Sequence, residues 1–301
     1  MTISAKVILD SSCMGSRITT MELKYPRFIH AEFMTHRVFS RNASSSRAIP
    51  VVKQIEMIME DTAMPIHWGK NQAGMQAREE NDAKVVIQTL DSAGILEQYL
   101  SKEEAWLAAR DQAVKIAKAF NEAGYHKQIV NRLLEPFSHI TVLVTSTQWA
   151  NFFALRNHPD AQPEIRELAI LMKAAMAASS AVILDQDDWH MPYITEEDVS
   201  DVYHKCKERR ITRDEPKKSE ITEMLCAISA ARCARVSYLT HDRKRPTIDE
   251  DLDLFRRLAY AEPPHMSPCE HQATYCQLND EGNYRNWTQF RHKIRGNTVH
   301  D

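Results

Sequence analysis

The stretch THRVFSRNASSSRAIP, residues 35–50, is the most informative part of the sequence. It contains a histidine, three arginines, four serines and an asparagine, but no glycine and no long apolar run. A core element is not built this way, and a solvated loop does not need so many fixed donors. Guanidinium and hydroxyl groups are the side chains that recognise phosphate. The stretch therefore predicts a segment that binds a ligand.

The composition of the whole chain is that of an ordinary globular protein. The 301 residues are 43% hydrophobic and 26% charged, with a formal net charge of −3, so no overall field favours a nucleic acid. The sequence has no apolar run long enough to span a membrane, and its N-terminus is unlike a signal peptide. The six cysteines form no CxxC pair. We expect reduced thiols in a cytoplasmic protein without membrane or nucleic-acid partners.

Hydrophobic periodicity predicts a chain of mixed strands and helices. Alternation over residues 3–9 and 18–24 predicts two strands, and Pro26 ends the second. The remaining expectations are helices, with one charged connector at 185–220: 28–34 (helix or tight turn), 51–64, 78–123, 126–135, 138–156, 161–183 and 221–239. Within the long helical stretch, Ser101 and Glu104 form a capping box and Gly124 is the stop signal.

Three separated segments resemble the flavin-dependent thymidylate synthases. The first, THRVFSRNASSSRA, is similar to the family signature R-H-R-x-x-S-x-N-x-x-S-x-R-Y. It departs from that signature at Thr35, Ala43 and Ala48, where the family has Arg, usually Glu, and Tyr. The second segment, residues 130–165, contains the NFFALR and AQPEI motifs. The third combines AARCARVSY (230–238) with HMSPCEH (265–271).

The order of these segments differs from that of the family. The third segment comes first in the family and leads by a strand into the signature, whereas here it comes last. The chain therefore resembles a circular permutation, which is tolerated where the old termini lie close together at the surface. This reading predicts that residues 265–277 form a strand beside the strand at 18–24.

The resemblance implies an α/β (α+β) fold with a mixed, mostly antiparallel sheet flanked by helices. We expect residues 1–301 to form one catalytic domain, with a signature and helical part (1–184), a connector (185–220) and a permuted segment (221–301). By the same resemblance the protein would be a homotetramer with FAD at the subunit interfaces. It would methylate dUMP to dTMP, using methylenetetrahydrofolate and NADPH as co-substrates.

Methylation at C5 of a uracil ring needs a phosphate anchor and a positive group that stabilises charge on the ring oxygens. By resemblance Arg156 would polarise the ring as the catalytic residue, while reduced flavin would supply the hydride. The implied substrate-binding residues are Glu32, Ser44, Ser45, Ser46, Arg47, Arg132 and Arg156. The implied cofactor-binding residues are Thr35, His36, Arg37, Asn42, Asn151, His265 and Ser267.

Two side-chain groups near the C-terminus have other possible roles. His265, Glu270 and His271 could suggest zinc, but a further ligand is missing, and we expect no metal. Cys269 stands in SPCEH where the family usually has Phe. It could attack C6 of the pyrimidine if it were exposed and its pKa lowered, but a small buried apolar substitute for Phe is the simpler reading.

Two other functions stay open from the sequence. One is a flavin- and folate-dependent hydroxymethylation of a pyrimidine nucleotide, dUMP or dCMP, since Glu32, Thr35 and Ala43 all depart from the family in the nucleotide and flavin region. The other is a non-catalytic nucleotide-binding relative that has lost flavin. Absorbance of bound flavin separates the binding protein from the enzymes, and the mass of the product separates the two reactions.

Overall fold

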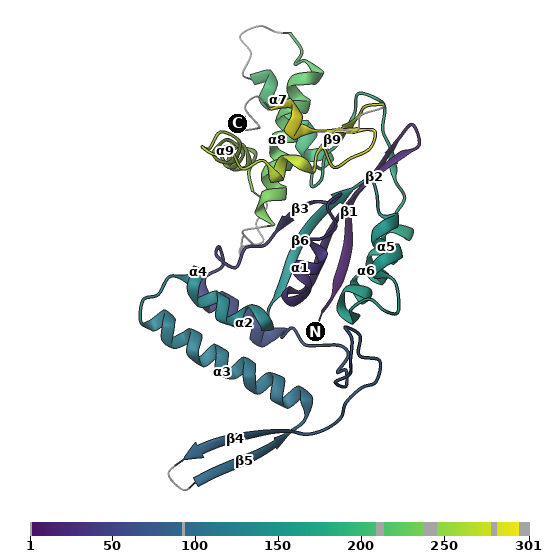
Figure 1. The fold of residues 1–301 in the computed structure, drawn as a ribbon. Coiled ribbons are helices and arrows are strands. Elements are labelled where there is room, and N and C mark those ends of the chain that lie inside the picture. The colour runs from purple at the N-terminus through teal and green to yellow at the C-terminus, as the bar shows by residue number, and fades with distance from the viewer. Residues whose placement is uncertain (1, 92–93, 209–213, 237–245, 278–281, 295–301) are drawn as a thin grey trace.

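A five-stranded sheet organises the first half of the chain. The computed structural model describes residues 2–91, 94–208, 214–236, 246–277 and 282–294 (Figure 1). The strand order is β3-β6-β2-β1-β7, from β1 (Ser4–Cys13), β2 (Ser16–Pro26), β3 (Ser40–Ala43), β6 (His139–Ser146) and β7 (Val182–Ile183). All neighbours are antiparallel except β1 and β7, which are parallel. The expected mixed, mostly antiparallel sheet is confirmed.

The β1–β2 hairpin follows directly from its turn residues. Met14 and Gly15 both have positive φ, 49° and 80°, which is the backbone of a tight turn that matches strand twist. Both strands predicted from alternation are confirmed, and Pro26 is the last residue of β2. The helix expected over 138–156 is wrong in its first half, since residues 139–146 form β6 and only Ala150–Arg156 form a helix, α5.

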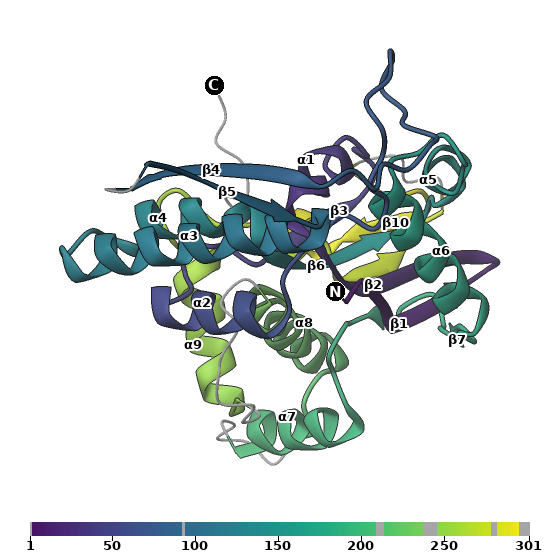
Figure 2. The same ribbon diagram turned by 90° about the horizontal axis from the view of Figure 1, so that it is seen from below.

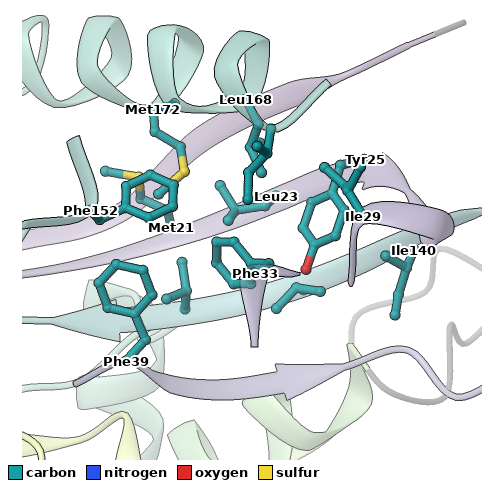
Figure 3. Close-up of a cluster of buried hydrophobic side chains, with 14 of the residues drawn as sticks. Met21, Leu23, Tyr25, Ile29, Phe33, Phe39, Ile140, Phe152, Leu168 and Met172 are labelled. Atoms are coloured by element: carbon teal, nitrogen blue, oxygen red, sulfur yellow. The ribbon is translucent and has the colours of Figure 1, made fainter. Parts of the chain in front are cut away.

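One face of the sheet carries the main hydrophobic core. Helices α5 and α6 (Pro163–Ala177), together with the short α1 (His30–Phe33), cover this face (Figure 1). Figure 3 shows Met21 and Leu23 of β2 against Phe152 of α5 and Leu168 and Met172 of α6. Each of these side chains is buried, so the amphipathic helix expected over 161–183 is confirmed for residues 163–177, while Val182 and Ile183 form β7 instead.

The C-terminal third covers the opposite face of the same sheet. Its elements are β8 (Trp189–His190), α7 (Glu196–Glu208), α8 (Lys218–Arg235), α9 (Ile248–Ala259), η3 (Ser267–Glu270), β9 (Ala273–Tyr275), β10 (Trp287–Gln289) and η4 (Phe290–Lys293). Cys233 of α8 and the adjacent Val236 pack on Leu143 of β6. The C-terminal third therefore belongs to the same packed body as the sheet.

A buried chain of hydrogen bonds joins this third to the sheet. His271 Nδ1 lies 2.8 Å from Thr145 Oγ1, which lies 2.6 Å from Thr20 Oγ1. Thr20 Oγ1 in turn lies 2.8 Å from His190 Nε2, and His190 Nδ1 lies 2.9 Å from Ser11 Oγ. All five side chains are buried, so their polar groups depend on one another for hydrogen bonds.

The expected pairing of residues 265–277 with the strand at 18–24 is wrong. Strand β2 pairs with β1 and β6, whereas β9 pairs with β8 and β10 in a separate three-stranded sheet. Residues 267–270 instead form the 3-10 turn η3, which lies against β3. Pro268 at the start of this turn favours such a turn over a strand. Ser237 and Tyr238 of the third family-like segment lie outside the described residues.

A helical layer lies beyond the edge strand β3. It consists of α2 (Val51–Glu60), α3 (Lys102–Glu122), α4 (Lys127–Val130) and η2 (Asn131–Phe137), with the 3-10 turn η1 (Arg27–Ile29) beside η2 (Figure 2). The capping box predicted at Ser101 and Glu104 is confirmed.

Two expectations about helices and connectors are corrected. Residues 85–100, expected as helix, form the hairpin of β4 (Val85–Asp91) and β5 (Gly94–Leu100), which projects from the body (Figure 1). Its valine, isoleucine and tyrosine residues favour strand over helix. The connector expected at 185–220 contains β8 and α7, because Val202 and Cys206 give α7 a buried apolar side despite its charges.

Candidate functional site

The turn that follows α1 presents the signature residues. Thr35 and Arg37 are exposed, while His36 is 7% exposed and packs edge-on against Phe152, with ring centroids 4.9 Å apart. Arg41 of β3 holds the turn in place, since its Nη1 donates to the carbonyl oxygens of Met34 (3.0 Å) and His36 (3.1 Å). The turn is therefore fixed from the sheet side.

Arg156, the last residue of α5, is held by three side chains of this region. Its Nε donates to His36 Nε2 at 2.9 Å, its Nη1 pairs with a Glu32 carboxylate oxygen, and its Nη2 lies 3.4 Å from Thr35 Oγ1. Because His36 Nε2 accepts this bond, it carries no proton. Burial, and then the charges of Arg156 and Arg41, lower the pKa of His36 to about 4, so the ring is neutral near pH 7.

Glu32 and Arg156 line the larger of two cavities beside the turn. This cavity has a volume of about 1580 Å³, and Phe28, Trp106 and Arg166 also line it. It combines aromatic surface with a guanidinium group whose orientation is fixed, which suits a polar planar ligand.

A second cavity, of about 700 Å³, lies on the other side of the turn. It is lined by Arg37 and Val38, by the turn Gly282–Arg285, and by Gln148. Two arginines that are 248 positions apart in the sequence thus line one cavity. Two successive residues of the turn therefore act at different cavities. His36 contacts Arg156, which lines the larger cavity, and Arg37 lines the second.

The serine-rich loop that follows β3 is held mainly by hydrogen bonds to its backbone carbonyl oxygens. Asn131 Nδ2 donates to the carbonyl oxygens of Ser46 (2.7 Å) and Ile49 (2.9 Å). Ser44 Oγ accepts from the Thr141 amide at 3.1 Å, and Ser46 Oγ donates to Glu135 at 2.8 Å. Two of the three serine hydroxyls thus have partners in the protein.

Ser45 and two arginines are the more accessible predicted phosphate ligands. Ser45 is half-buried, while Arg47 of the loop and Arg132 of η2 are exposed. Arg27 lies beneath the loop and donates from Nη2 to the Ser44 carbonyl at 3.2 Å. Its Nε is buried with no partner within the described residues. Burial lowers its pKa, because the charged guanidinium is less well solvated inside the protein, while Glu135, whose carboxylate lies 4.0 Å from Nη1, opposes that shift.

The other predicted cofactor residues are dispersed. Asn42 of β3 is buried, and its Nδ2 has no partner in the part of the chain that the structure describes. Asn151 of α5 is exposed, as are His265, which precedes η3, and Ser267, the first residue of η3. The segment that carries His265 and Ser267 nevertheless reaches the signature strand, because η3 lies against β3.

Cys269 lies inside the C-terminal core. Its side chain is 1% exposed, and burial, followed by the charge of Glu270, raises the pKa of its thiol to about 12. A buried thiol with a raised pKa is a poor nucleophile, which agrees with the apolar role expected for this residue.

Within the described ranges no group of three or more His, Cys, Asp and Glu side chains could hold a metal ion. No described helix has both the length and the apolar character that crossing a bilayer requires.

The structure therefore gathers only part of the predicted set. Glu32, Thr35, His36 and Arg156 meet at one point, whereas Arg37 faces the second cavity and Arg47 and Arg132 belong to the region of the serine-rich loop. Sequence reasoning missed Arg27, Gln148, Asn283 and Arg285. Arg27 could have been found from the sequence, because an arginine directly after the proline that ends a predicted strand lies where the chain leaves the sheet. The other three are recognisable only from tertiary packing.

Comparison with known proteins gives one family. A family model described as thymidylate synthase complementing protein matches residues 12–179. Among solved structures, the chain is similar to the UMP/dUMP methylase PolB from Streptomyces cacaoi bound with 5-Br UMP, with a TM-score of 0.41 and 17% identity over 58% of this chain and 89% of that one. The same enzyme bound with 5-Br dUMP gives 0.39 and 16% over 58% and 90%. No curated protein matches the chain.

Proposed function

Since its match to the family model spans residues 12–179 of 301, the chain belongs to the thymidylate synthase complementing protein family, and we propose that it methylates dUMP at C5. The chain is an enzyme of the thymidylate synthase-like methyltransferase class. The substrate, the one-carbon donor methylenetetrahydrofolate, the reductant NADPH and the cofactor FAD are parts of the proposal.

The arrangement around residues 35–38 carries this proposal. On one side Arg156 lines a cavity of about 1580 Å³, and on the other Arg37 lines a cavity of about 700 Å³. A reaction between a nucleotide and a dinucleotide cofactor needs two adjoining sites that each accept a negatively charged molecule. If residues 35–50 contact both ligands, their many hydrogen-bond donors are explained.

Arg156 acts on the substrate in this proposal. For C5 to attack the one-carbon unit and lose its proton, the ring must become electron-rich at C5, which places negative charge on the ring oxygens. A guanidinium held by Glu32 and His36 does not have to reorient when that charge develops. The neutral His36 ring accepts from Arg156 and leaves its positive charge uncompensated on that side.

The serine-rich loop is the proposed phosphate site. Ser45, Arg47 and Arg132 would donate to the phosphate of the nucleotide, beside the half-buried Arg27. The loop is held rigidly by Asn131, so the donors are positioned before binding. Because these groups and Arg156 belong to different regions of one chain, we propose that neighbouring copies in a homotetramer complete each site.

The residues near the second cavity fit a flavin dinucleotide. Arg37 supplies a guanidinium for a diphosphate, and the partnerless Nδ2 of the buried Asn42 is a donor available to a ring carbonyl. Bound flavin would supply the hydride that reduces the one-carbon unit. Thr35, His36 and Asn151, with His265 and Ser267 near β3, are the further proposed contacts.

Hydroxymethylation of a pyrimidine nucleotide is favoured by one specific observation. Glu32 and Thr35, two of the positions that depart from the family, both contact Arg156 directly. The positions that differ from the family therefore surround Arg156, the group that would polarise the ring. In that reaction the one-carbon unit is hydrated rather than reduced.

One experiment tests the proposal. The purified protein is reconstituted with FAD, examined for a flavin absorbance band, and incubated with methylenetetrahydrofolate, NADPH and either dUMP or dCMP. We expect a product heavier than dUMP by one methyl group. A product heavier by a hydroxymethyl group would replace methylation with the second reaction, and absence of both flavin binding and product would refute the proposed function.

A further inference from the structure

The second cavity is walled by two segments from opposite ends of the chain. One is the signature turn at Arg37 and Val38, and the other is the turn Gly282–Arg285, which lies outside the part of the chain that the family model matches. We propose that this cavity binds the diphosphate of the dinucleotide cofactor between Arg37 and Arg285. The inference rests on the proposed function and assigns to it residues of the C-terminal third.

The two turns are anchored to neighbouring residues where β6 ends. Ser146 Oγ donates to the Val38 carbonyl oxygen at 3.3 Å, and the amide of Arg285 donates to Thr147 Oγ1 at 3.1 Å. Gln148, the next residue, lines the cavity itself. The spacing between the two arginine-bearing turns is therefore set by consecutive residues of one segment.

The C-terminal wall is also fixed to the signature strand. Asn283 Nδ2 donates to Ser40 Oγ of β3 at 3.1 Å, and Gln289 Nε2 donates to the same oxygen at 2.9 Å. The adjacent Tyr284 is buried, and its hydroxyl donates to the Glu270 carbonyl oxygen at 2.6 Å. These bonds fix the backbone of the turn before binding, so that only the exposed side chain of Arg285 has to be ordered by a ligand.

The charge of the lining selects an anion. Arg37 and Arg285 are the charged side chains among the described residues of the lining, and Gln148 and Asn283 are amides. Two guanidinium groups that share one cavity repel each other in the free protein, and an anion between them removes that repulsion while it gains charge-assisted hydrogen bonds. The chain as a whole has a net charge of −3, so this concentration of positive charge is local.

A diphosphate suits the two cations better than a single phosphate does. Guanidinium groups bind phosphate oxygens in a planar fork, and two linked phosphates offer one fork to each arginine. The nucleotide substrate carries a single phosphate, for which the serine-rich loop is the proposed site. The two phosphate sources are therefore assigned to different places and can be tested separately.

The test compares ligands that differ in their phosphates. Arg285→Ala, Arg285→Lys and the control Arg257→Ala, an exposed arginine on α9, are titrated with FAD and with riboflavin, using quenching of flavin fluorescence. We expect Arg285→Ala to weaken FAD binding at least tenfold and to reduce its salt dependence. Riboflavin, which has no phosphate, should bind as in the wild type, and Arg285→Lys should recover part of the affinity for FAD.

Several outcomes would overturn the inference. Unchanged FAD affinity in Arg285→Ala would remove this residue from the cofactor site while leaving the proposed function in place. An equal loss for riboflavin would assign the effect to the shape of the turn instead of its charge. A loss for dUMP without a loss for FAD would show that the anion is the phosphate of the substrate. A wild-type protein that binds no FAD would overturn both this inference and the cofactor of the proposed function.

Discussion

Replacing Arg156 with lysine keeps the positive charge but removes the planar set of donors. In the wild type, Nε donates to His36 Nε2 at 2.9 Å while Nη1 pairs with Glu32. A lysine ammonium can approach Glu32, but its single nitrogen cannot hold both partners in the same geometry. We therefore expect Arg156→Lys to fold, to bind the nucleotide, and to lose most of its turnover.

Two separate magnitudes follow from this geometry. His36 is 7% exposed, so its Nε2 acceptor would be left unsatisfied, which costs about 1–3 kcal/mol of unfolding free energy. Losing one positioned donor to the developing charge costs about 10²–10³ in kcat. The loss of turnover should thus exceed the loss of stability, because the first concerns the transition state and the second only the resting contact with His36.

The assay measures both quantities on the same preparation. Turnover is followed by the mass of the nucleotide product, and the free energy of unfolding is taken from urea denaturation. Arg166→Lys, an exposed arginine on α6 that lines the same cavity, is the matched control and should change neither quantity appreciably. Wild-type turnover in Arg156→Lys would refute the role of the fixed guanidinium. A loss of unfolding free energy large enough to account for the lost turnover would show that the substitution acts through folding and not through the transition state.

Arg47→Ala should weaken dUMP binding by about 2–3 kcal/mol, the value of a charge-assisted contact, and leave FAD binding unchanged in a titration with both ligands; equal dUMP affinity would exclude Arg47 from the site. Cys269→Ala should retain turnover, because the thiol is buried and its pKa is raised to about 12, and a folded, flavin-bound but inactive variant would restore the nucleophile. Acidification should destabilise the protein, because His30, His36 and His139 have pKa values lowered to about 4 in the folded state, mainly by burial, against about 6.5 unfolded. Their contribution is complete above pH 6.5 and is lost as pH falls toward 4, so urea midpoints that stay constant from pH 7 to 5 would contradict the neutral histidines.

The strands and helices that the sequence predicted correctly are those with one buried side. Strands β1 and β2 alternate, and α6 has a single apolar stripe. Strand β6 was mistaken for helix because it is central and covered on both faces, so its run of apolar and β-branched residues carries no period of two. Helix α7 was not predicted because most of its residues are charged or polar and only a narrow side of it is buried.

The candidate site divides in the same way. His36, Arg37 and Asn42 were predictable because they stand in one short stretch with recognisable spacing. The contact of Arg156 with His36 joins residues 120 positions apart, and the two walls of the second cavity are further apart still. Such neighbours arise from how strands and turns pack, which local patterns of residue type do not encode.

The covering of the sheet by the last third of the chain has a consequence for biosynthesis. Trp287 Nε1 donates to Ser16 Oγ, across 271 residues of sequence. At about 5–20 residues per second, a ribosome needs roughly 15–55 s to make that length of chain. Until then the nascent sheet exposes the face that carries Leu143 and its buried threonines. We expect this protein to depend on chaperones during translation and to reach its native state only after release, with loop closures over long separations setting the pace.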